Sequence, residues 1–266
     1  MCSESISRSF ILSLTALFVS VLIPVGSCFA ECIPGDDPCA PKKKIGEWDN
    51  SVAFGFNMTS GNSSTRLVTV LGNTYYEKDS DIVEGTLMYN FGEDRNVDDE
   101  KNGSTTRNDF RVLGQYNHLV TERTFLGFGS KFFYDEIADI DYRVFVSPSA
   151  GYYFLKDNTF KLRLEGGPSY VFERVGGLND EYLAPRLANR FDWFITCTSK
   201  IYQTAEILGD TNDSQNFLVN AEVGIESALS TALSLVVLVR ETFDNQPAEG
   251  RDKGDLAVIS ALKVAI

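Results

Sequence analysis

The sequence predicts an all-β protein: an antiparallel, up-and-down transmembrane β-barrel of about twelve strands after a cleaved signal peptide. Three observations predict this fold. The chain starts with an apolar segment typical of bacterial export signals, and most of the rest divides into two-faced strands. The last strand, residues 256–266, carries a mostly apolar face with Lys263 on the opposite face, as expected where a sheet closes on itself.

Residues 1–30 form the expected export signal. A basic residue precedes an apolar run from Phe10 to Val25, and small residues follow up to Ala30. The run is too short for a membrane-spanning helix, so we expect cleavage after Ala30 and delivery to the cell outer membrane. One alternative stays open, because Val25-Gly26-Ser27-Cys28 has the form of a lipoprotein processing site that would leave an acylated Cys28.

The mature chain then divides into a periplasmic segment, residues 31–47, and a barrel domain, residues 48–266. Cys32 and Cys39 flank a short loop in the first segment, where an oxidising compartment favours a disulfide between them, whereas Cys197 stands alone. Two thiols with no nearby histidine do not make a zinc site, and we expect no metal and no cofactor. A net charge of −13 argues against a nucleic-acid partner.

Alternating apolar and polar residues between turn signals give twelve strands, an even number as in single-chain bacterial barrels. The 19 Phe, 11 Tyr and 21 Gly suit strands and tight turns. Pro148, Pro168 and Pro185 each remove a backbone donor, and residues 235–239 are apolar on both faces, so bulges or bends are expected there. In chain order the expected strands are 48–58, 65–77, 81–92, 107–119, 123–135, 141–155, 159–174, 182–197, 199–208, 215–228, 233–243 and 256–266.

Charged residues alternate with apolar ones on several strands. In 159–174, Phe160, Leu162 and Leu164 share one face, and charged side chains occupy most of the other. A charge facing lipid near the midplane costs about 2–4 kcal/mol, so the charged faces are expected to line the lumen. Arg186 is expected to point inward for the same reason. The lumen-lining candidates are Lys131, Arg163, Glu165, Arg190, Asp192, Glu222 and Glu226.

The connections are expected to differ between the two ends of the barrel. With a periplasmic amino terminus, the inner turns are 78–80, 120–122, 156–158, 197–198 and 229–232. The outer loops are 60–64, 93–106, 136–140, 175–181, 209–214 and 244–255, and the two longest connections, 93–106 and 244–255, both lie in this set. A soluble periplasmic β-sandwich has no reason for such a bias, which favours the membrane barrel.

Several short motifs resemble a known family. They are Ser60-Gly61-Asn62-Ser63-Ser64-Thr65, then Asp141-Tyr142-Arg143 with Gly151-Tyr152-Tyr153, Leu164-Glu165-Gly166-Gly167, and Phe243-Asp244-Asn245-Gln246-Pro247 before the last strand. With these motifs the stretch from Trp48 to Ile266 resembles the bacterial family of salt-induced outer-membrane proteins, whose function is unknown. The resemblance implies an outer-membrane barrel without an assigned activity. Outer-membrane strands often end in Phe, and here Ile266 stands at that position, which bears on recognition by the barrel-assembly machinery.

Catalytic and metal-binding patterns are weak. The single histidine, His118, has no nucleophile motif beside it, so a structural or interface role is favoured over a lipase base, and we expect no enzyme. The acidic group Asp94, Asp98, Asp99 and Glu100 lacks the spacing of a calcium loop and is expected to be a solvated run.

Two function classes follow from these residues. One is a structural or interaction barrel whose lumen is filled by mutually paired charges and whose outer loops meet partners or lipopolysaccharide. The other is a pore for small solutes or ions, with the same charges setting its selectivity. Mixed signs in the lumen favour pairing and therefore the first class. A soluble periplasmic protein or a lipoprotein is the third hypothesis. The sequence does not indicate an oligomeric state.

Overall fold

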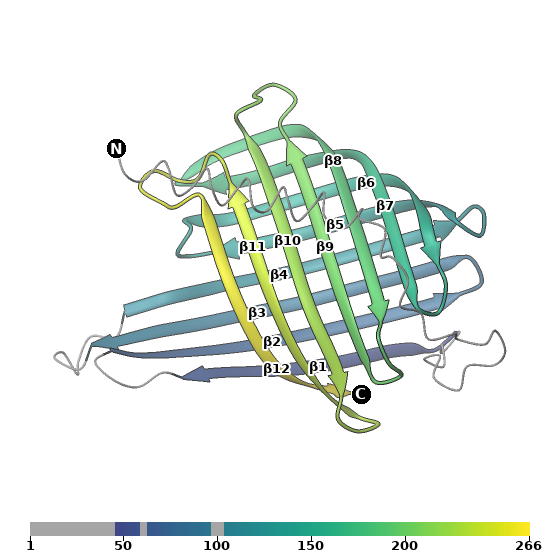
Figure 1. Cartoon of the computed structure of the whole chain (residues 1–266). Coiled ribbons are helices and arrows are strands. Elements are labelled where there is room, and N and C mark those ends of the chain that lie inside the picture. Colours follow the sequence, from purple (N-terminus) through teal and green to yellow (C-terminus); the bar gives the residue numbers. More distant parts are fainter. Residues whose placement is uncertain (1–45, 59–62, 97–103) are drawn as a thin grey trace, which may run out of the picture. The chain divides into compact units, whose positions relative to one another are not determined.

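The computed structural model describes residues 46–58, 63–96 and 104–266, and in these ranges twelve antiparallel strands form a closed barrel (Figure 1). The predicted fold class and strand number are confirmed. In the described part of the chain, no helix is long and apolar enough to cross a membrane. The strands are β1 (Trp48–Met58), β2 (Ser63–Lys78), β3 (Asp81–Asn96), β4 (Ser104–Leu119), β5 (Thr124–Asp135), β6 (Ile140–Lys156), β7 (Phe160–Val175), β8 (Leu178–Phe194), β9 (Ser199–Gly209), β10 (Phe217–Ala228), β11 (Leu233–Asp244) and β12 (Gly254–Ala265).

Each strand pairs with its neighbours in sequence, and the last strand closes the sheet against the first. The register between β1 and β12 joins four residue pairs, from Ser51 with Ala265 to Phe54 with Leu262. By contrast, β1 pairs with β2 along its whole length, from Trp48 to Met58. The closing strand behaves as the sequence predicted, and Figure 1 shows β1 and β12 meeting near the carboxyl terminus and then diverging.

The two faces of the sheet have opposite character. Large apolar side chains are exposed on the outer face, including Phe54, Leu126, Phe128, Val223 and Leu256. Buried polar and charged side chains lie on the inner face, because they alternate with the exposed ones along each strand. An apolar outer face with a polar interior is the arrangement of a transmembrane barrel.

The connections define two ends of the barrel. The turn end carries 79–80, 120–123, 157–159, 195–198 and 229–232, and the loop end carries the others. The longest connections, 97–103, 210–216 and 245–253, are at the loop end, as predicted, although the first of them lies outside the described residues.

One predicted loop is wrong. Residues 175–181 were expected to form a loop, but β7 and β8 are joined by Gly176 and Gly177 alone, with φ angles of 59° and 75°. Two consecutive positive φ angles match the twist of the flanking strands in a two-residue hairpin, and glycine adopts them without strain. As a result β8 starts at Leu178 and ends at Phe194, rather than spanning 182–197.

The predicted bulges are also misplaced. Within the described strands, register shifts occur at Gly92, Phe133, Ile140 and Tyr153, none of which is a proline. Pro168 and Pro185 face each other in an unbroken register, whereas the β6–β7 ladder is interrupted around Pro148 without a shift. The missing proline donors therefore break the ladder locally instead of adding a residue to one strand. β11 keeps its register on both sides through 235–239, because its inner apolar residues pack in the lumen.

Some predictions fall outside the described residues: the export signal, residues 31–45 with Cys32 and Cys39, the candidate lipid site Cys28, and the acidic positions 98–100. Cys197 is the one cysteine of the described ranges. It is disulfide-bonded, so the expectation that it stands alone is wrong.

Candidate functional site

Three cavities follow one another along the inside of the barrel. The turn-end cavity, about 560 Å³, is lined by residues near the turns, such as Asp49, Lys161 and Lys200. The middle cavity, about 240 Å³, lies deeper, and the loop-end cavity, about 50 Å³, reaches the connection that contains Pro247. Neighbouring cavities share lining residues, so the side chains between them decide whether a solute can pass.

Paired charges separate the turn-end cavity from the middle cavity. Arg163 on β7 donates to both carboxylate oxygens of Glu84 on β3, over 3.1 and 2.8 Å. These strands are not neighbours, so the pair crosses the lumen. Next to it, Arg240 donates to Glu222 from the adjacent strand. All four side chains line both cavities, and they form the boundary that we call the charge partition.

A second group of charges lies in the middle cavity, the tetrad of Lys131, Glu165, Arg186 and Glu206. Glu206 on β9 accepts hydrogen bonds from Lys131 on β5 and from Arg186 on β8. Arg186 also donates to Glu165 over 2.7 Å. Each of the four side chains of the tetrad is at least four-fifths buried. Because the tetrad contains two cations and two carboxylates, its formal charge is balanced. Such a pairing offsets the desolvation of each ion.

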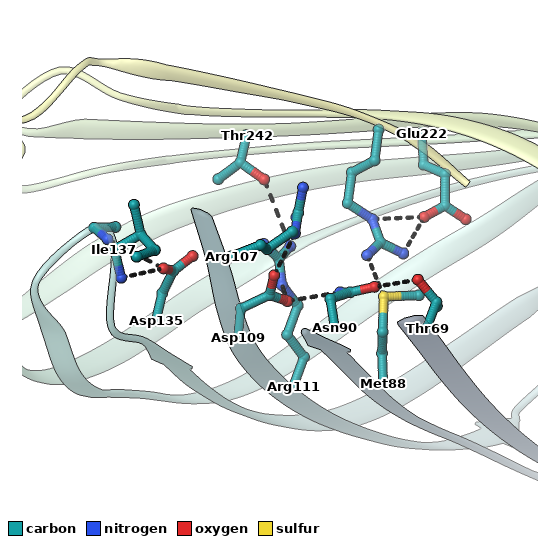
Figure 2. Close-up of polar contacts among 12 residues, drawn as sticks. Thr69, Met88, Asn90, Arg107, Asp109, Arg111, Asp135, Ile137, Glu222 and Thr242 are labelled. Atoms are coloured by element: carbon teal, nitrogen blue, oxygen red, sulfur yellow. Dashed lines mark hydrogen bonds and ion pairs between the residues drawn. The ribbon is translucent and has the colours of Figure 1, made fainter. Parts of the chain in front are cut away.

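A polar chain continues toward the loop end on β2, β3 and β4 (Figure 2). Thr69 donates to Asn90, which donates to Asp109, and both bonds are 2.8 Å long. Asp109 also accepts from Arg107 over 2.6 Å and lies 3.4 Å from Arg111. The Arg111 guanidinium stands over the Phe133 ring, 5.2 Å from its centroid, and both residues line the middle and loop-end cavities.

The loop end is narrow. Arg143 is buried between Glu173 and Asp244, with 2.7 Å to the latter. Ala248, in the connection 245–253, is 7% exposed and lines the loop-end cavity together with Pro247. A Cβ on Gly176 would lie 3.4 Å from the Ala248 side chain, which shows how closely this connection packs on the β7–β8 hairpin. The remaining cavity has room for no more than a few water molecules.

The turn end is wider and more polar. Glu226 accepts from Lys263 over 2.7 Å and lies 3.2 Å from Lys200. Arg190 donates twice to Asp192, over 2.9 and 3.0 Å, and its guanidinium stands above the Tyr202 ring. The wall of the large cavity thus consists of paired charges and tyrosines.

The seven candidates from the sequence all line these cavities. Lys131 and Glu165 lie in the middle cavity, Asp192 and Glu226 in the turn-end cavity, and Arg163, Arg190 and Glu222 line both. Four of their partners, Glu84, Lys200, Glu206 and Arg240, were not predicted from the sequence. Glu84 could have been found, because Val83, Leu87 and Tyr89 alternate with it on an apolar outer face. Glu206 and Arg240 were harder to predict. Gln203 is a polar residue on the outer face near Glu206, and Arg240 follows a run that is apolar on both faces, so neither strand alternates cleanly there.

His118 lies away from these cavities. It is about half exposed near the turn end, and its Nδ1 is 2.8 Å from Asp81, which also accepts from Tyr116 over 2.7 Å. No serine hydroxyl is among the contacts seen for His118 in the described ranges. In those ranges no group of three or more His, Cys, Asp or Glu side chains is arranged to hold a metal ion.

Solved structures with the same kind of fold include an outer-membrane channel from Pseudomonas putida F1. It is 11% identical, with a TM-score of 0.50, and the match covers 89% of this chain and 100% of the channel. The NanC porin matches at 8% identity and a TM-score of 0.45, over 81% and 97% of the two chains. The translocator domain of the autotransporter NalP from Neisseria meningitidis matches at 10% identity and a TM-score of 0.44, over 82% and 86%. At such identities the likeness to the channel concerns the fold alone.

No curated protein matches this sequence. A family model, however, matches residues 52–265, which is nearly the whole barrel. The chain therefore belongs to the family described as protein of unknown function, DUF481.

Proposed function

We propose that the protein is an outer-membrane β-barrel whose lumen is held closed by paired charges. The observation that carries this proposal is the row of buried ion pairs along the lumen: Glu226 with its two lysines, the charge partition, the tetrad, and Arg143 with its two acids. Paired charges have little tendency to release one another to a passing ion, because a separated partner would stay buried and unpaired.

Location in the outer membrane is supported by the outer face of the barrel. Phe128 is 51% exposed, and Leu126, Val258 and Leu262 on the same surface are also open to the surroundings. A continuous apolar band of this kind is stable in lipid and unstable in water. The test is fractionation of cells that make the full chain: the protein should be found in the outer-membrane fraction, with a gel mobility that changes on heating. Sequencing of the mature amino terminus would show cleavage after Ala30, or a lipid-blocked Cys28.

Closure is tested by single-channel recording of the purified protein in planar bilayers. The wild type should show no conductance steps. A variant without the ion pairs of the narrow loop end (Arg143→Ala, Glu173→Ala, Asp244→Ala) and without the pair that crosses the lumen at the charge partition (Glu84→Ala, Arg163→Ala) should produce steps, provided that its heat-modifiable mobility shows a folded barrel. Regular steps from the wild type would refute the closed lumen.

A narrow pore is the second candidate, because the three cavities follow one another along one path. In that case the wild type conducts, and neutralising Glu84 or Arg163 at the charge partition changes the conductance and the preference for cations over anions.

Four further points remain proposals. The salt-induced character rests on the sequence resemblance, and the amount of protein after a rise in NaCl would test it. Contacts with lipopolysaccharide follow from the outer location, and assembly by the barrel-assembly machinery follows from the fold. A non-catalytic role is proposed from the isolated position of His118, and the absence of lipase activity in the pure protein would agree with it.

A further inference from the structure

The middle cavity gathers buried polar atoms that lack a hydrogen-bond partner. The described residues contain eight such side-chain atoms. Three of them belong to charged residues that line this cavity: Arg186 Nη1, Glu165 Oε2 and Arg111 Nε, of which the last still has the Asp109 carboxylate 3.4 Å away. Each of these side chains is at least nine-tenths buried. Leaving a buried charged donor or acceptor unsatisfied is expensive in free energy, so their concentration in one cavity indicates a ligand.

Two of these atoms, one donor and one acceptor, belong to side chains that are hydrogen-bonded to each other. Arg186 Nη2 donates to Glu165 Oε1, and the second nitrogen of that guanidinium and the second oxygen of that carboxylate are the unsatisfied atoms. A hydroxyl group can accept from the guanidinium and donate to the carboxylate at the same time. Two hydroxyls on neighbouring carbons could serve both atoms.

The charge of the tetrad selects against ions. Lys131 and Arg186 are balanced by Glu165 and Glu206. Each of the other arginines of this cavity has a carboxylate partner of its own: Arg111 with Asp109, Arg163 with Glu84, Arg190 with Asp192 and Arg240 with Glu222. An added anion or cation would therefore gain no net counter-charge and would still lose its hydration. A neutral solute does not carry this desolvation penalty. The other lining residues fit such a solute, because Thr86, Gln115 and Thr204 supply further polar groups and Phe133 supplies an apolar wall.

We infer that the middle cavity is a binding site for a small neutral polyhydroxylated solute, such as a polyol or a monosaccharide. Its 240 Å³ suits a molecule of this size and is too small for a longer chain. The site is reached from the turn-end cavity across the charge partition. The inference rests on the proposed barrel: a neutral solute enters from the turn end when the pairs of the charge partition separate, while the pairs at the loop end stay closed.

The test is saturation-transfer NMR on the purified full-length protein in detergent, with sorbitol, glucose and gluconate as separate probes. The neutral probes should receive saturation from the wild type, and gluconate should receive much less. Glu165→Gln replaces the unsatisfied acceptor by an amide, and Arg186→Lys removes the second guanidinium nitrogen. Each should weaken binding by about tenfold or more. Arg174→Lys, at an arginine that pairs with Asp141 and lines none of the three cavities, is the control and should bind as the wild type does.

Heat-modifiable mobility shows which variants are folded. Lys131→Gln, which unbalances the charge of the tetrad, takes the place of any variant that does not fold. With Lys131→Gln, the saturation that sorbitol and glucose receive should not increase. Binding of gluconate in preference to sorbitol and glucose would overturn the assigned solute class. No binding of any probe by the folded wild type would overturn the site and leave water as its occupant. Conductance is a separate readout: a wild type that conducts and binds sorbitol refutes the closed lumen but supports the site.

Discussion

Glu206 is the residue on which the tetrad depends most, and its replacement gives a sharp test of the lumen. Its side chain is 9% exposed and accepts from two cations. Glu206→Gln keeps the shape but leaves Lys131 and Arg186 facing a single carboxylate, Glu165. Breaking a buried pair by removing one partner costs about 3–5 kcal/mol, so the free energy of unfolding should fall by about that amount.

The same reasoning predicts a smaller effect for Lys131→Met, about 1–3 kcal/mol, because Glu206 keeps its bond to Arg186. In the double variant the remaining Arg186–Glu165 pair is balanced. The two effects should therefore sum to more than the double variant loses, with a coupling of about 1–3 kcal/mol.

The assay is equilibrium unfolding by urea in detergent micelles, followed by tryptophan fluorescence and by gel mobility. Glu181→Gln, at an exposed site on β8, is the control and should lie within about 0.5 kcal/mol of the wild type. A loss below about 1 kcal/mol for Glu206→Gln, or additive effects in the double variant, would show that water already solvates the tetrad and that its pairing does not hold the lumen closed.

Three other changes test the lipid face, the strand packing and the loops. Phe128→Arg places a charge on the outer face and should destabilise the barrel in lipid vesicles by about 2–4 kcal/mol. Thr204→Arg, in comparison, would place the charge in the lumen. Equal stability of Phe128→Arg and the wild type would contradict the contact of this face with lipid. A Cβ at Gly167 would stand 2.2 Å from the Pro148 carbonyl oxygen, so Gly167→Ala should reduce the folded fraction on gels, while Gly114→Ala, with open space around it, should not. Asp213 accepts from the Gln215 amide and from Gln246, which lowers the pKa of its carboxyl below the ordinary value. A lowered pKa stabilises the folded form above the unfolded pKa of about 4, and this contribution is lost as pH falls through the folded value. The amide protection factors in 245–253, which correct for the slower intrinsic exchange in acid, should therefore fall at low pH in the wild type, and Asp213→Asn should remove that pH dependence.

The fold could be predicted because alternation is a local property of the sequence. The apolar residues Phe160, Leu162 and Leu164 identify the outer face of β7 without information about any other strand. The errors arose where geometry rather than polarity decides. Gly176 and Gly177 permit a two-residue hairpin, and the polar residues that follow them suggest a loop in the sequence although they belong to β8.

For the candidate site, the sequence predicts the lumen-lining residues but not how they pair. Alternation identifies which charged side chains point inward, but not which of them meet. Arg163 on β7 donates to Glu84 on β3, which is four strands away around the barrel. Lys131 on β5 donates to Glu206 on β9, which is also four strands away. Such pairs depend on barrel diameter and on the stagger of the strands, which are properties of the closed sheet.

The seam between β1 and β12 explains why part of the lumen is apolar. Only four residue pairs join these strands, so hydrogen bonds alone hold this seam less firmly than the others. The buried cluster of Ala53, Leu71 and Met88 on one side with Leu238 and Ile259 on the other spans the same place. Burial of each large side chain contributes about 1.5–3 kcal/mol, which offsets several missing ladder bonds. The inner apolar face of β11, which the sequence shows as a run that is apolar on both faces, thus follows from its position near the weakest seam of the barrel.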